Sequence, residues 1–175
     1  MSNSSPKALI LGIDNFVARK LALTLVNKDI NVIGVGNYVS DLANISKIKL
    51  LDRLDNLDIL PNYIFDFNGE IDNLENFVSE DIKITVISVN NEDKSAFIQK
   101  QLRDFRGNWR FIEAYGVYGP NGEDDNFLNR AIRQSVLNEN LILPPISSLY
   151  RILAVDDLIE AILRASFFSG TSGEN

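Results

Sequence analysis

The sequence predicts an open, doubly wound α/β domain with a mostly parallel sheet. Short apolar runs, typical of strands buried on both faces, alternate along the chain with segments of helical periodicity. At this spacing such runs form right-handed βαβ units, and helices then cover both faces of the sheet. The 175 residues suit a single domain spanning 1–175 with its core at about 7–168. Whether the chain is a fragment of a longer protein stays open.

The first half of the chain supplies three of the expected strands. The continuous apolar run at 8–11 is typical of a buried strand, and apolar residues at helical spacing predict a helix over 16–28. The stretch NVIGV at 31–35 predicts the second strand. The pattern KIKLL at 47–51 is less regular and favours a short third strand.

The second half continues the alternation. YIFDF at 63–67 predicts the fourth strand, and a helix is expected over 71–78. IKITVISV at 82–89 predicts the fifth strand, a helix is expected over 94–105, and the sixth strand over 109–114. The side chains expected to face inward from the helix at 94–105 are Phe97, Ile98 and Leu102. We also expect Trp109 in the core.

Composition and charge exclude several classes of function. The chain has no His and no Cys, so imidazole bases, thiolate nucleophiles, disulfides and most zinc sites are excluded. A net charge of −7 argues against binding to nucleic acid or to an anionic membrane. No apolar run is long enough to span a bilayer. We therefore expect a cytoplasmic protein with no metal site, no nucleic-acid partner and no membrane partner.

Ligands of such sheets bind beyond the carboxyl ends of the strands, at the switch point beside the first strand. The segments expected at that edge are 12–18, 36–37, 52, 66–68, 88–91 and 115–120. The first of them has a glycine, an Asn and an Ala at the positions where a dinucleotide-binding GxxGxxG turn has three glycines, namely Gly12, Asn15 and Ala18. The turn could still form and offer helix amides to an anion. A tight βα turn without a ligand explains the pattern equally well.

Two further motifs carry a family resemblance. A Val-Tyr-Gly-Pro turn at 117–120 follows the sixth strand, and after Arg151 a Val-Asp-Asp segment at 155–157 opens a later helix. Together with the first turn, they resemble the extended short-chain dehydrogenase/reductase family of NAD-dependent nucleotide-sugar epimerases and dehydratases. The resemblance implies a Rossmann-like NAD(P)-binding fold and NAD or NADP as cofactor. The cofactor-binding residues it implies are Gly12, Asn15, Phe16, Asn37, Asp52, Phe67, Asn68, Ser88 and Tyr118.

The chain also departs from the family pattern. Gly36 stands where the family has the acid that binds the adenosine ribose, and Phe67 stands where the family has small residues and could crowd the site. Ser88 falls near the catalytic Ser/Thr, and Lys94 begins the next helix as the family Lys does. The residue four before this Lys is Asn90 instead of the acid/base Tyr. A turn serine and a solvated lysine therefore explain Ser88 and Lys94 better than catalysis does.

Other polar residues have structural explanations too. Asp156 and Asp157 are expected to cap a helix, and the acidic run at 123–125 is expected to be a solvated loop. Tyr115 and Tyr118 could line a cleft or pack on the sheet edge, and Arg151 could hold a substrate phosphate or be an ordinary exposed arginine.

Three hypotheses of function remain. The first is a shortened NAD(P)-binding domain of the epimerase/dehydratase kind without the standard Tyr-Lys oxidoreductase chemistry. The second is an interaction or regulatory module that kept the fold and lost the cofactor, with a homodimer or a protein as partner. The third is part of an enzyme whose remaining residues lie in another segment or chain.

Overall fold

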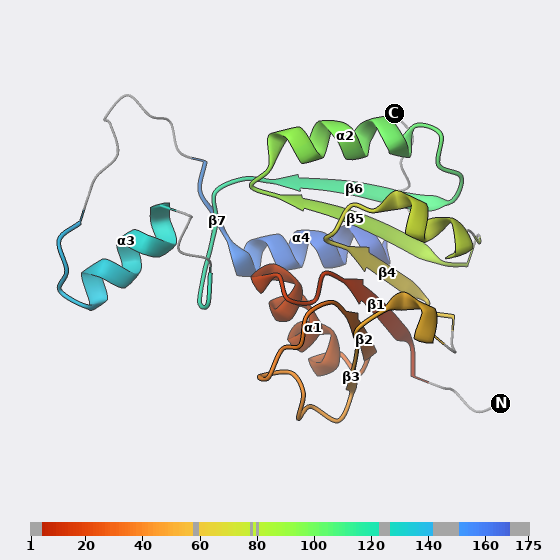
Figure 1. Ribbon diagram of the computed structural model, residues 1–175, viewed down its shortest axis with the longest axis horizontal. Coiled ribbons are helices and arrows are strands. Elements are labelled where there is room, and N and C mark those ends of the chain that lie inside the picture. The colour runs from red at the N-terminus through yellow and green to blue at the C-terminus, as the bar shows by residue number, and fades with distance from the viewer. Residues whose placement is uncertain are drawn as a thin grey trace.

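A computed structural model describes residues 5–57, 60–77, 79, 81–122, 127–141 and 151–168. Its centre is a six-stranded, wholly parallel sheet with the order β3-β2-β1-β4-β5-β6, which confirms the predicted fold class (Figure 1). The strands are β1 (Lys7–Leu11), β2 (Asn31–Val35), β3 (Ile48–Leu51), β4 (Tyr63–Asp66), β5 (Lys83–Val89) and β6 (Asn108–Ala114). All six predicted strands are present. The order reverses between β1 and β4, which fixes the switch point.

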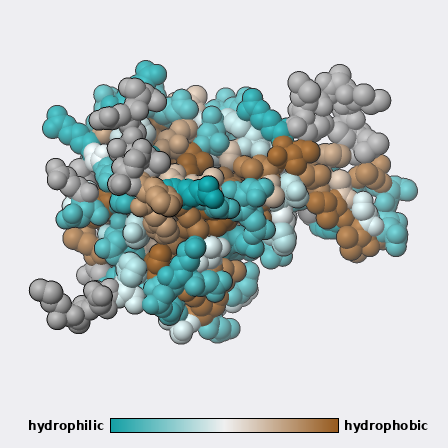
Figure 2. Space-filling model, turned by 180° about the vertical axis from the view of Figure 1, so that it is seen from behind, coloured by the Kyte–Doolittle hydropathy of each residue, from teal (hydrophilic) through white to brown (hydrophobic). Residues whose placement is uncertain are grey.

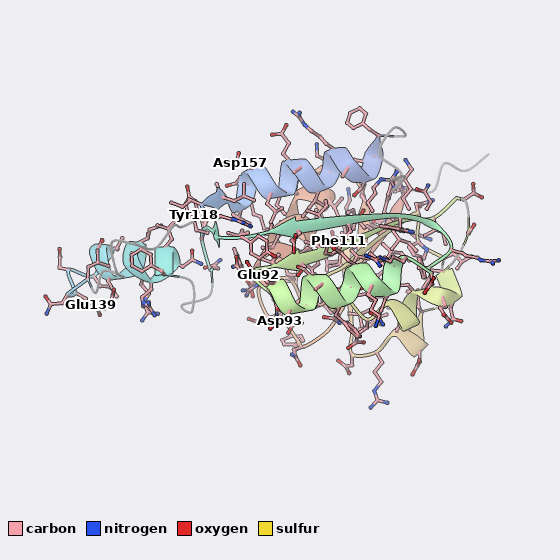
Figure 3. The ribbon with its side chains drawn as sticks, turned by 90° about the horizontal axis from the view of Figure 1, so that it is seen from above. Glu92, Asp93, Phe111, Tyr118, Glu139 and Asp157 are labelled. Atoms are coloured by element: carbon pink, nitrogen blue, oxygen red, sulfur yellow. The ribbon has the colours of Figure 1, made fainter. Side chains whose placement is uncertain are left out.

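Helices cover both faces of the sheet. On one face lie α1 (Phe16–Asn27) and α4 (Val155–Phe167), which contact each other. The other face carries α2 (Glu92–Leu102) and the 3-10 helix η2 (Ile71–Phe77), and Figure 3 shows α2 and α4 on opposite sides of β6. A second 3-10 helix, η1 (Leu54–Asn56), follows β3.

Successive strand residues divide between two apolar cores because neighbouring side chains of a strand point to opposite faces. On the α1 and α4 side, Ile10 of β1 packs with Phe65 of β4 and Ile87 of β5. On the α2 side, the adjacent residues of the central strands, Leu9 and Ile64, belong to the second core. Since both faces are buried, the strands are nearly all apolar, which is why the sequence showed runs instead of alternation.

Two helical predictions need correction. The segment predicted as a helix at 71–78 is the 3-10 helix η2, and the helix predicted at 94–105 is α2, so Lys94 is its third residue. Ile98 and Leu102 are buried as expected, but Phe97 is 59% exposed. The buried residues of α2 are Ser95, Ile98 and Leu102, spaced at three and four positions, and Phe97 falls outside this stripe. Trp109 is half-buried against the α2-side core.

A short parallel pair, β7 (Val117–Tyr118) with β8 (Leu153–Ala154), brings the two family motifs together beside the main sheet. Gly116 allows the backbones of the two segments to lie close together. Its φ is +63°, and a Cβ there would lie 1.5 Å from the carbonyl oxygen of Arg151. Between β7 and β8 the chain forms α3 (Phe127–Val136), which lies apart from the sheet and its covering helices (Figure 1).

The end of the chain corrects one further expectation. Asp156 and Asp157 lie in the first turn of α4, but the N-cap is Ala154 and no side chain caps the helix. Asp156 instead pairs with Lys20 of α1 at 2.8 Å. The two carboxylates can still stabilise the positive end of the helix dipole.

We predict that Gly116→Ala lowers the free energy of unfolding by well over about 1 kcal/mol, because it adds backbone strain and a clash with the Arg151 carbonyl. Asn121→Ala is the matched control, since Asn121 has a nearly identical φ of +61° and is exposed. Chemical denaturation followed by the fluorescence of Trp109 measures both variants. Equal losses in the two variants would contradict the close approach at Gly116.

Candidate nucleotide-binding edge of the sheet

The turn after β1 is tied to the end of β2. The backbone amides of Gly12 and Ile13 both donate to the carbonyl oxygen of Val35, at 2.9 and 3.2 Å. Gly12 has a φ of +77°, and a Cβ there would lie 2.5 Å from Asn68 Oδ1, so a glycine is needed both for conformation and for space. The turn therefore keeps the first feature of a phosphate-binding loop.

The N-terminus of α1 is partly satisfied by its own cap. Asn15 is the N-cap, and its Oδ1 accepts a hydrogen bond of 2.9 Å from the amide of Val17. No hydrogen bond joins the amides of Phe16 and Ala18 to another residue in the described part of the chain. One of the three first-turn amides is thus occupied, and two remain for an anion. The Phe16 side chain itself is buried in the α1-side core.

A carboxylate lies at the end of β2 although the sequence has none there. Asp14, in the turn after β1, places its Oδ1 2.5 Å from where a Cβ of Gly36 would be. Its Oδ2 accepts a hydrogen bond of 2.9 Å from the side-chain amide of Asn37. Asp52, after β3, is exposed at the same edge of the sheet. The sequence predicted Asn37 and Asp52 as site residues but not Asp14, whose only signal was its place inside the turn.

The end of β4 holds a buried carboxylate. Asp66 is fully buried, its Oδ1 accepts from the amides of Asn68 and Gly69 at 2.8 and 3.0 Å, and its Oδ2 has no partner among the described residues. Burial raises the pKa of Asp66 above its ordinary value, against the opposing effects of the two amides and of the Lys94 charge. Lys94 Nζ donates to the carbonyl oxygen of Phe67 at 2.9 Å. This lysine therefore holds the loop after β4.

Phe67 lies in the apolar core and not in the open edge. Its side chain is 6% exposed and packs with residues of β1 and α1. Its Cβ lies beside the turn, 3.3 Å from where a Cβ of Gly12 would be. Asn68 is exposed, and its Oδ1 lies against Gly12.

The end of β5 carries a serine pair instead of a Ser-Tyr-Lys arrangement. Ser88 Oγ and Ser95 Oγ lie 2.8 Å apart, and both lie within hydrogen-bond distance of the carbonyl oxygen of Asn91. Asn90 occupies the turn before α2 with a φ of +56°, and its Oδ1 accepts from the amide of Val117 at 3.4 Å. Hence this asparagine supports the β6–β7 connection and is not part of a helical pair with Lys94.

A cluster at the end of β6 was not predicted. The Tyr115 hydroxyl donates to the carboxylate of Glu113, and the guanidinium of Arg151 lies 5.0 Å from the centre of the tyrosine ring. This hydrogen bond lowers the pKa of Glu113 and raises the pKa of Tyr115. Because Glu113 pairs in register with Ser88, the cluster continues the row of polar groups across the edge. Tyr115 stays protonated at neutral pH, so it is a hydrogen-bond donor here and not a base.

Tyr118 lies outside this row. It lines an open cavity of about 710 Å³ between the turn after β7 and α3, together with Asn129, Ile132 and Arg133. Figure 3 labels Tyr118 between α3 and the main sheet. The amide of Gly119 donates to Asn129 Oδ1 at 3.0 Å, which joins the two walls of the cavity.

The structure brings most of the predicted residues to one edge. The turn at 12–16, Asn37, Asp52, Asn68 and Ser88 all lie at the carboxyl ends of the strands, with Tyr118 in the neighbouring cavity. The acidic run at 123–125 lies outside the described residues. Within the residues that are described, no group of carboxylates could hold a metal ion. None of the helices described is long and apolar enough to cross a membrane.

Comparison with solved structures gives a consistent fold. The chain is similar to dTDP-glucose 4,6-dehydratase from Bacillus anthracis, solved with NAD, at a TM-score of 0.77 and 13% identity, over 97% of this chain and 74% of that one. It is also similar to UDP-glucose 4-epimerase from Thermotoga maritima, solved with UDP-glucose, at a TM-score of 0.71 and 13% identity, over 92% of this chain and 73% of that one. A third similar structure is UDP-N-acetylglucosamine 4-epimerase from Bacillus cereus, with a TM-score of 0.69 and 14% identity over 97% of this chain and 74% of that one. The sequence matches no protein-family model and no curated protein.

The chain therefore has the Rossmann-like fold of the NAD-dependent epimerases and dehydratases. This confirms, at the level of the fold, the resemblance to the extended short-chain dehydrogenase/reductase family.

We predict that Asp66 makes the protein's stability depend on pH in an unusual direction. Because its folded pKa lies above the ordinary value of 3.8, the folded state binds the proton more tightly, so the contribution of Asp66 to stability increases as the pH falls through the raised pKa. The unfolding free energy of wild type minus that of Asp66→Asn should increase from neutral pH towards pH about 4. Asp104→Asn, at an exposed site after α2, is the control. A difference that is flat or decreases on acidification would contradict the burial argument.

Proposed function

We propose that the chain binds NAD or NADP across the carboxyl edge of its sheet and does not use Tyr-Lys proton transfer. The observation that carries this proposal is the glycine turn at Gly12, held on Val35, which directs the free first-turn amides of α1 to the switch point. The solved neighbours support it, since the Bacillus anthracis dehydratase holds NAD on the same fold.

The residues present fit the cofactor in part. The free amides of Phe16 and Ala18 would hold the pyrophosphate, and the exposed Asn37 and Asp52 lie where an adenosine would extend over β2 and β3. The cap formed by Asn15 competes with the pyrophosphate for the Val17 amide. We therefore expect weaker binding than in a turn with three glycines.

The proposed lack of standard chemistry rests on the groups around Ser88. A bound nicotinamide cofactor would supply a hydride acceptor or donor. The chain would still need a group that moves a proton, and the residue four before Lys94 is Asn90. Lys94 itself is engaged with the Phe67 carbonyl oxygen. Tyr115 follows β6 and its hydroxyl donates to Glu113, so it does not replace the missing tyrosine.

A second candidate function is an interaction module, favoured by the outer surface of α3. Ile132, Val136 and Leu137, which we call the α3 apolar face, are 47%, 75% and 55% exposed. Figure 2 shows brown residues gathered on the lobe at the right of the view, which extends from the main body. A homodimer or a protein partner could cover this face.

A cytoplasmic location remains a prediction from the sequence.

Calorimetric titration with NAD and with NADP tests the leading function. Saturable binding of either cofactor supports it, and absence of binding at millimolar cofactor contradicts it. Sedimentation velocity without nucleotide tests the second function. Self-association that Val136→Asp abolishes would favour an interaction module.

We predict that Asn15→Gly raises the affinity for NAD by about tenfold, because it frees the Val17 amide for a charged acceptor. A glycine cap costs helix stability only a few tenths of a kcal/mol, so the fold should persist. Asn62→Gly, before β4 at the opposite edge of the sheet, is the matched control and should leave the affinity unchanged. An unchanged or lower affinity of Asn15→Gly would contradict the competition between the Asn15 cap and the pyrophosphate for the Val17 amide.

A further inference from the structure

Asp14 belongs to the turn after β1, but its side chain lies over the end of β2. The two hydrogen bonds from Gly12 and Ile13 to the Val35 carbonyl oxygen fix the turn against the end of β2. The side chain of Asp14 then lies over Gly36, with Oδ1 2.5 Å from the position of a Cβ. Gly36 has a φ of +150°, so a side chain there would meet both backbone strain and the Asp14 carboxylate.

The carboxylate is also oriented. Asn37 donates from its side-chain amide to Asp14 Oδ2 at 2.9 Å, so one carboxylate oxygen is held and Oδ1 stays beside the glycine. Asp14 and Asn37 are both exposed, so a ligand lying across the end of β2 can reach this pair. A carboxylate next to an amide accepts hydrogen bonds from hydroxyl groups and repels a phosphate.

We propose that Asp14 determines cofactor specificity by accepting hydrogen bonds from the adenosine ribose hydroxyls, which selects NAD against NADP. The inference rests on the proposed cofactor function. In NAD-binding sheets of this kind an acid at the end of the second strand binds the ribose 2′-hydroxyl, and Gly36 cannot supply one. Asp14 supplies the carboxylate from the neighbouring turn, and the missing side chain of Gly36 makes room for it.

Two arginines, Arg19 and Arg53, bear on the choice between NAD and NADP. Arg19 of α1 pairs with Asp41 at 3.9 Å, so this arginine already has a carboxylate partner. Arg53, exposed after Asp52 at the end of β3, is a cation that a 2′-phosphate could engage. A preference for NADP that Arg53→Gln removes would therefore overturn the proposal.

The test is calorimetric titration of wild type, Asp14→Asn and the control Asp104→Asn with NAD and NADP. Wild type should bind NAD at least about tenfold more tightly than NADP, and Asp14→Asn should lose most of this ratio by weakening NAD. Asp104→Asn, at an exposed site after α2, should keep the wild-type ratio. An unchanged ratio in Asp14→Asn, with NAD still bound, overturns the role of Asp14 and leaves the cofactor function standing.

A second titration separates the two claims if neither dinucleotide binds. Adenosine and 2′-deoxyadenosine are added to isotope-labelled protein while the side-chain amide resonance of Asn37 is followed. The ribose contact is supported if adenosine shifts this resonance, if 2′-deoxyadenosine binds at least about tenfold more weakly, and if Asp14→Asn removes the shift. This result would support the ribose contact even though the cofactor function fails. No shift with either nucleoside overturns the ribose contact as well.

Discussion

The carbonyl oxygen of Val35 accepts two successive amides from the turn after β1, and the functional edge of the sheet depends on this contact. It joins the ends of the two strands beside the switch point and starts α1 at a fixed place. It also forces Gly12 to a positive φ and carries the Asp14 side chain over Gly36. The proposed phosphate contact and the proposed ribose contact are therefore two consequences of one turn.

The same edge contains groups that compete with a ligand. Asn15 occupies one amide of α1, Asn68 packs on Gly12, and Lys94 holds the loop after β4 through the Phe67 carbonyl oxygen. Each contact stabilises the free protein by a modest amount, because a typical internal hydrogen bond contributes about 1 kcal/mol net. A charged pyrophosphate can displace such a cap. The balance between these contacts and the cofactor decides between a cofactor domain and an interaction module.

The sequence predicted the strands, their parallel arrangement and the first turn because these depend on local apolar runs and on one glycine. It did not reveal Asp14 over Gly36, because that contact depends on the register between β1 and β2. The cluster of Glu113, Tyr115 and Arg151 was hidden for a similar reason, since the close approach at Gly116 brings residue 151 back to β6. The burial of Phe67 in the α1-side core could not be predicted either, because the direction of a side chain just after a strand depends on the turn that follows.

A crystal structure grown with NAD tests the central claim, that the carboxyl edge is a nucleotide site, most directly. The account predicts the pyrophosphate beside the amides of Phe16 and Ala18 and the adenosine ribose within hydrogen-bond distance of the Asp14 carboxylate. An edge that retains the contacts of Asn15 with Val17 and of Asp14 with Asn37, with no nucleotide beside Gly12 at saturating NAD, would contradict it.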